Sequence, residues 1–149
     1  MRTSNITLVA AVIGAGLAYG APQSMAVDIA LPSAALDLTK ARELIKAKDW
    51  PAAISELKGL AGTYQGADLY NLLGFSLRKS GDHKTALTYY QKALDFDPNH
   101  KGAREYLGEL YVETKQLDKA KEQLAILVKL CPQGCEERAD LEQAIAAAK

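Results

Sequence analysis

The chain has 149 residues, of which 48% are hydrophobic and 24% charged, and its 18 basic and 18 acidic side chains give a formal net charge of zero. This composition is typical of a soluble globular protein with a single domain. There is no run of lysine and arginine, and only 7% of the residues are aromatic, so the chain lacks the charge and the stacking side chains of a nucleic-acid-binding protein.

The start of the chain, from Met1 to Ala26, matches the three-part pattern of a secretory signal peptide. Arg2 makes the start positively charged, residues 6–21 carry no charge, and Ser24 and Ala26 have the spacing of a cleavage site. The apolar run is shorter than the roughly 20 residues that a membrane-spanning helix prefers. We therefore expect residues 1–26 to be a signal peptide that is cut after Ala26.

The predicted mature chain runs from Val27 to Lys149 and contains no second long apolar segment, so we expect no membrane insertion after cleavage. A cut near Gly20 and an uncleaved N-terminal anchor are the alternatives. We expect a periplasmic or secreted protein. The bacterial periplasm is favoured because no cell-wall or lipidation signal accompanies the leader.

Beyond a predicted linker at 27–33, two adjoining segments of equal length, 67–100 and 101–134, repeat the same pattern. The identical residues at matching positions are Leu73 and Leu107, Gly74 and Gly108, Ala86 and Ala120, and Pro98 and Pro132. A weaker copy occupies residues 34–66, where Ala41 replaces the glycine and the closing proline is missing.

This pattern resembles the tetratricopeptide repeat (TPR), a helix–turn–helix unit of about 34 residues. In the middle copy the matching positions are Tyr70, Leu73, Gly74, Leu77, Ala86, Tyr90, Ala93 and Pro98. The resemblance implies an all-α helical-repeat solenoid with three repeats, of which the first is degenerate, followed by a capping helix within 135–149. We expect helices at about 35–47, 51–63, 67–80, 83–96, 101–114, 117–130 and 136–148.

The small residues Ala41, Gly74 and Gly108 are expected to let the two helices of one repeat approach each other closely. In the last helix, Leu141 and Ile145 recur at helical spacing and are expected to face the stack. A polar-faced end piece of this kind is needed to cover the open apolar side of a repeat array.

The two cysteines, Cys131 and Cys135, fall at the end of the sixth predicted helix and at the start of the capping helix. Because export places them in an oxidising compartment, we expect an intrachain disulfide between them and no metal. A metal site or a redox pair are the alternatives. Zinc usually takes four ligands, and the two histidines, His83 and His100, are distant in sequence.

No motif of a known catalytic type, such as G-x-S-x-G, H-E-x-x-H or a glycine-rich phosphate loop, occurs in the predicted mature chain. We therefore expect no enzymatic activity and no cofactor.

The TPR resemblance also implies a concave groove, lined by the first helix of each repeat, that holds a peptide segment of a partner. The residues placed in this groove are Arg42, Asp68, Asn71, Phe75, Arg78, Glu105, Tyr106 and Glu109. Asn71 is expected to bond a peptide backbone, Phe75 and Tyr106 to offer apolar contacts, and Arg42 and Arg78 to bind carboxylates.

These features together predict an exported protein–protein interaction module, an adaptor or assembly factor. We expect its partner to be a protein or peptide and expect it not to bind nucleic acid. The groove departs from the Lys-Asn-Arg clamp with which some TPR domains hold chaperone tails, which argues against such tails as ligands. Two alternatives are a metal- or thiol-handling protein that uses Cys131 and Cys135, and a structural subunit of an envelope complex.

Overall fold

A computed structural model describes residues 36–148, and this part of the chain consists of helices and turns without a strand. The helices are α1 (Thr39–Lys46), α2 (Trp50–Ala61), α3 (Ala67–Lys79), α4 (His83–Phe96), α5 (Lys101–Glu113), α6 (Leu117–Leu130) and α7 (Glu136–Ala147). The predicted all-α fold is confirmed. The predicted signal peptide, its cleavage site and the linker lie outside the described residues.

The first helix begins later than the sequence predicts. Residues 36–38 are not helical, and α1 starts at Thr39 instead of near residue 35. The reason is local: a side-chain oxygen of Asp37 accepts a hydrogen bond from the backbone N–H of Thr39 at 2.9 Å. Aspartate at this place satisfies an amide that a longer helix would bond through its backbone.

Side chains cap the starts of three other helices. Asp49 and Asp82 each accept a hydrogen bond from the backbone N–H three residues on, at 3.2 and 3.1 Å. At the start of α5, Nδ1 of His100 accepts from the N–H of Ala103 at 3.0 Å. That bond leaves Nε2 of His100 as the protonated nitrogen, which donates to Asp68 at 2.9 Å.

The turn inside each helix pair has one residue in the left-handed backbone conformation at the corresponding position. Gly81 has a φ of 92° between α3 and α4, whereas Lys48 and Lys115 have φ values of 58° and 59° in the corresponding turns of the other two pairs. Glycine adopts this conformation without a steric penalty, but a lysine there costs about 1–2 kcal/mol. The repeat therefore dictates the turn geometry even where the sequence supplies no glycine.

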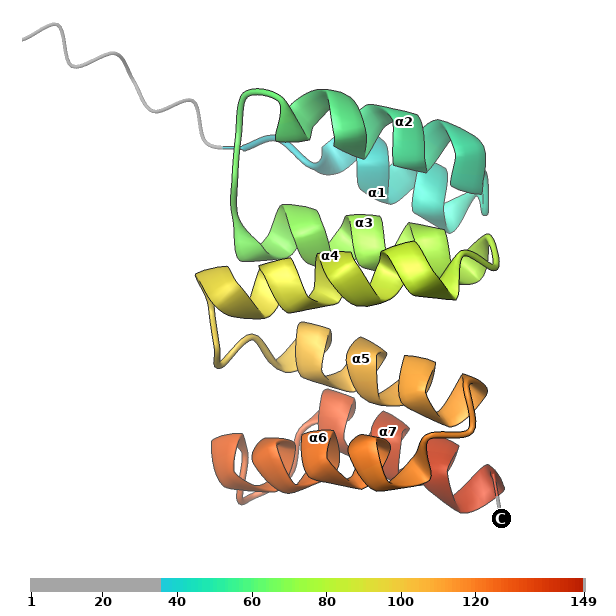
Figure 1. Ribbon diagram of the computed structural model, residues 1–149. Helices are drawn as coiled ribbons and strands as arrows, with labels where there is room; N and C mark the ends of the chain where they lie inside the picture. The colour runs from blue at the N-terminus through green and yellow to red at the C-terminus, as the bar shows by residue number, and fades with distance from the viewer. Residues whose placement is uncertain (1–35, 149) are drawn as a thin grey trace, which may run out of the picture. The chain divides into compact units, whose positions relative to one another are not determined.

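The helices stack in sequence order (Figure 1). Successive helices run in opposite directions because the turns that join them lie alternately at one end and at the other end of the helices. Along one side, α3 contacts α5 and α5 contacts α7. On the other side α2, α4 and α6 make no comparable contacts with one another within residues 36–148. The stack therefore curves toward the side formed by α3, α5 and α7, which is called the concave side below.

Two glycines mark the closest helix contacts. A Cβ on Gly74 would lie 2.7 Å from Cδ1 of Tyr90 in α4, so this glycine does let the two helices of its repeat approach. Gly108 meets the capping helix first: its Cβ would lie 2.5 Å from Cδ2 of Leu141, which belongs to α7. Leu141 and Ile145 are buried against the stack, as predicted.

Candidate functional site

The eight residues that the sequence places in the groove lie on α1, α3 and α5, and they differ widely in exposure. Arg42 on α1 is exposed, and 67% of the Asp68 side chain is accessible although it accepts the hydrogen bond of His100. Phe75, Tyr106 and Glu109 are partly buried. The other three, Asn71, Arg78 and Glu105, are buried.

A row of aromatic rings runs from Trp50 at the start of α2, over Phe75 of α3, to Tyr106 of α5. The rings of Trp50 and Phe75 meet edge to face with centroids 6.1 Å apart, and those of Phe75 and Tyr106 are 4.9 Å apart. None of the three is fully buried. Trp50, the first residue of α2 after the capping Asp49, was not among the residues predicted from the sequence.

Arg78 occupies the centre of a polar cluster between α3, α4 and α5. Its guanidinium donates to Glu109 at 2.5 Å, to Glu113 at 2.7 Å and to the hydroxyl of Tyr90 at 3.3 Å. It also lies 5.6 Å from the ring centre of Phe75. Burial opposes its charge, but Tyr90 and the two carboxylates outweigh this effect and raise the pKa of Arg78 above its usual value.

This cluster changes what Arg78 can do. The side chain is 3% exposed and its donors already face two carboxylates of the same chain. Arg78 therefore positions α5 against α3 rather than presenting a free cation to a ligand. Of the two arginines expected to bind carboxylates, Arg42 is the one whose side chain is open to solvent.

Asn71 also has a buried polar atom to satisfy. Its Oδ1 has no hydrogen-bond donor among the described residues, and the residue is 6% exposed. Its Nδ2 would lie 3.3 Å from a Cβ on Gly102, so the amide packs against the start of α5. A buried carbonyl without a donor is costly, and a ligand that supplies a donor would relieve that cost.

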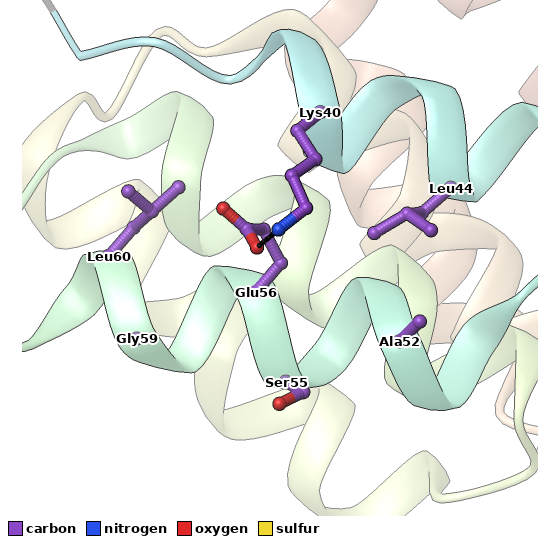
Figure 2. Close-up of a pocket in the computed structure, with 7 residues that line it drawn as sticks. All are labelled: Lys40, Leu44, Ala52, Ser55, Glu56, Gly59 and Leu60. Atoms are coloured by element: carbon purple, nitrogen blue, oxygen red, sulfur yellow. Dashed lines mark ion pairs between the residues drawn. The ribbon is translucent and has the colours of Figure 1, made fainter.

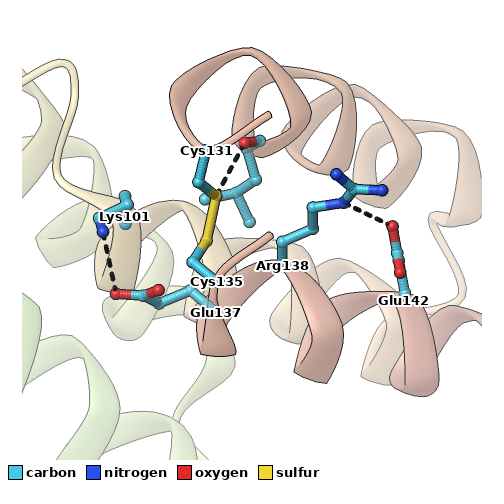
Figure 3. Close-up of a disulfide and its surroundings, with 7 residues drawn as sticks. Lys101, Cys131, Cys135, Glu137, Arg138 and Glu142 are labelled. Atoms are coloured by element: carbon cyan, nitrogen blue, oxygen red, sulfur yellow. Dashed lines mark hydrogen bonds and ion pairs between the residues drawn. A yellow bond between two sulfur atoms is a disulfide. The ribbon is translucent and has the colours of Figure 1, made fainter. Parts of the chain in front are cut away.

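The two cysteines lie together at the far end of the stack. Their sulfur atoms are 2.09 Å apart, within disulfide-bond distance, and connect the end of α6 to the start of α7 (Figure 3). In the chain-entropy description, closing so short a loop stabilises the fold by about 2 kcal/mol. The nearby ion pairs are Lys101 with Glu137 at 4.0 Å and Arg138 with Glu142 at 2.8 Å.

A hollow of about 410 Å³ lies between α1 and α2 (Figure 2). Lys40 reaches across it to Glu56 at 2.6 Å, and the aliphatic side chains of Leu44 and Leu60 flank the pair. Because the Lys40 side chain is largely exposed, this ion pair contributes little to stability.

The described residues contain no group of three histidine, cysteine, aspartate or glutamate side chains that could hold a metal ion. Within the same part of the chain, no helix is both long and apolar enough to span a bilayer.

Two family models, both described as tetratricopeptide repeat, match residues 38–101 and 77–145. The chain belongs to the tetratricopeptide repeat family. The matched segments overlap and together cover every described helix except the last two residues of α7. The TPR assignment that the repeat pattern predicted is therefore confirmed.

Curated relatives of this TPR protein match only part of it. The uncharacterized protein ycf37 of Pyropia yezoensis is 41% identical over 54 residues, which is 36% of this chain and 30% of that protein. The ycf37 protein of Guillardia theta is 39% identical over 56 residues, or 38% and 32% of the two chains. The chain thus spans about a third of the length of these relatives.

Among solved structures, the TPR stack is similar to PcrH in complex with the chaperone binding region of PopD, with a TM-score of 0.63 at 19% identity over 73% of this chain and 83% of that chain. It is also similar to PcrH in complex with the chaperone binding region of PopB, with a TM-score of 0.62 at 19% identity over 74% and 89% of the two chains. At this identity the likeness shows a shared fold.

Proposed function

We propose that this TPR protein is an exported interaction module that holds a peptide or protein segment of a partner along its concave side, as an adaptor or assembly factor without catalysis of its own. The observation that carries the proposal is the contact between Phe75 and Tyr106. These rings meet where α3 and α5 face the concave side, and each keeps part of its surface accessible. Accessible aromatic rings on a rigid scaffold are the side chains that most often dominate protein interfaces.

The comparisons support this reading. The similar PcrH structures are complexes with the chaperone binding regions of PopD and PopB, so the same fold holds polypeptide segments in those proteins. On the concave side of this chain, Asn71 has a buried oxygen without a donor, and a backbone N–H of a bound segment would supply one.

Photo-crosslinking from Phe75 tests the groove. A benzoylphenylalanine in place of Phe75 should crosslink to a protein or peptide in the cells that make this chain, because it lies on the concave side. The matched control is the same replacement at Phe96, which is 50% exposed at the end of α4. Mass spectrometry identifies the crosslinked product. Equal products from both positions, or none from position 75, would count against groove binding.

Export is the second part of the proposal and has its own test. The chain purified from its natural cells without reductant should have the intact mass of residues 27–149. Because Cys131 and Cys135 are expected to be oxidised, that mass should be two hydrogen atoms lower than after reduction. A chain that retains residues 1–26, or that has two free thiols after air exposure, would contradict export with an oxidised pair.

A further inference from the structure

A pocket of about 220 Å³ opens between α5 and α7, beside the aromatic row of the concave side. It is lined by Gly102, Glu105 and Tyr106 of α5 and by Glu136, Glu137 and Asp140 of α7. Four of these six residues carry a carboxyl group and none carries a basic one. Tyr106 belongs both to the pocket and to the aromatic row.

Glu105 is the buried member of the pocket, and its carboxylate lacks a partner. The residue is 7% exposed, and among residues 36–148 its side chain accepts no hydrogen bond and forms no ion pair. Arg78 is occupied by Glu109 and Glu113. Its carboxyl oxygens are not sealed from solvent, since Asn71 Oδ1 is the one fully buried side-chain oxygen or nitrogen without a partner among the described residues. The carboxyl group of Glu105 can therefore be reached only through the pocket, where a donor from a ligand would replace the few water molecules around it.

The other polar groups keep the pocket negative. Glu136 and Glu137 lie in the first turn of α7, where the helix N-terminus favours negative charge. Lys101 lies near the mouth of the pocket, with its ammonium 4.0 Å from Glu137 (Figure 3). Lys101 is exposed and does not line the pocket.

The charge of Glu105 depends on what occupies the pocket. Burial first, and then Glu109, Asp140 and Glu137, raise the pKa of Glu105 to about 8, while Arg78 acts in the opposite direction. In the empty pocket the carboxyl group therefore holds its proton at neutral pH. A cation beside it would favour the ionised form and release that proton.

We propose that this pocket receives the positively charged side chain of a lysine or arginine in the segment bound on the concave side. The inference rests on the proposed function and names the chemistry of the partner. The volume equals that of several water molecules, which leaves room for an ammonium or guanidinium group with part of its stem. A guanidinium or ammonium supplies the donors that Glu105 lacks.

A synthetic peptide library separates this inference from the proposed function. The probe is a random library of N-acetylated peptides, so that no free amino terminus competes for the pocket. The full chain is compared with Glu105→Gln, which keeps the shape of the side chain and removes its charge. The matched control is Glu122→Gln on the exposed surface of α6, and circular dichroism verifies that all three chains are equally helical.

The unaltered chain and Glu122→Gln should retain peptides enriched in lysine or arginine at one position, and Glu105→Gln should lose that enrichment. Replacing the enriched lysine of a selected peptide by norleucine should weaken its binding by a factor of roughly 30 or more for the unaltered chain. The same replacement should have little effect for Glu105→Gln.

Binding of the lysine peptide should also strengthen as the pH rises from about 6 to about 8, since less proton must then be displaced from Glu105. Lysine stays charged throughout this interval, and burial raises the pKa of the neighbouring Tyr106 to about 12, so it stays neutral. Glu105→Gln should abolish this pH dependence.

The results that would overturn the inference also show whether the proposed function survives. Peptides retained without a basic preference, or with the same preference in Glu105→Gln, would leave the concave side as a peptide-binding surface but remove the role of the pocket. No retained peptide at all would remove the proposed function and the cation pocket with it.

Discussion

Replacing Arg78 with alanine should lower the free energy of unfolding by about 3–5 kcal/mol. The guanidinium is buried and bonded to Glu109, Glu113 and Tyr90, so its removal takes this partner from both carboxylates and leaves a cavity beside the buried Tyr90 hydroxyl. Equilibrium unfolding in urea, followed by circular dichroism, measures the loss. The matched control is Arg42→Ala, because Arg42 is exposed on α1 and should change stability by less than about 0.5 kcal/mol.

A compensated variant tests the cause. If the loss comes from unpaired charge, Arg78→Met combined with Glu109→Gln and Glu113→Gln should recover most of it, because apolar and neutral replacements remove the unpaired charges together. Equal costs for Arg78→Ala and Arg42→Ala would show that the cluster does not stabilise the packing of α3 against α5.

Gly74→Leu is expected to destabilise the chain by about 3 kcal/mol or more. Its first side-chain atom would already lie 2.7 Å from the ring of Tyr90, and that ring is fully buried and has no space into which to move. The same unfolding measurement checks this prediction. Loss of helix at 25 °C is the expected result if the middle repeat no longer forms.

Gly59→Leu is the matched control for this substitution. Gly59 lies inside α2, and a Cβ there would have no neighbour within 4 Å. Leucine has the higher helix propensity, so this variant should be neutral or more stable by up to about 1 kcal/mol. If Gly74→Leu were tolerated as well as Gly59→Leu, close packing of the two helices would not be what requires the glycine.

Most of the fold followed from the sequence because its signals are local. Helix caps at Asp49 and Asp82, together with the repeated pattern of small and large residues, place the helix starts without reference to distant parts of the chain. The exception is α1, where the bond between Asp37 and Thr39 shortens the helix. That signal was also local, but it competes with helical periodicity and was not recognised in the sequence.

The period of small and large residues by itself determined the helical-repeat stack, because each helix pair can bury its apolar face only against the next pair. It also placed the eight candidate groove residues on the first helix of each repeat. Tertiary structure alone decided what those side chains do. Arg78 meets carboxylates on the next repeat, a Cβ on Gly108 would meet Leu141 of α7 first, and Glu105 lines a pocket between α5 and α7. The physical reason is that a repeat pattern specifies which face a residue occupies, whereas its charge partners and its burial depend on how neighbouring helices pack against that face.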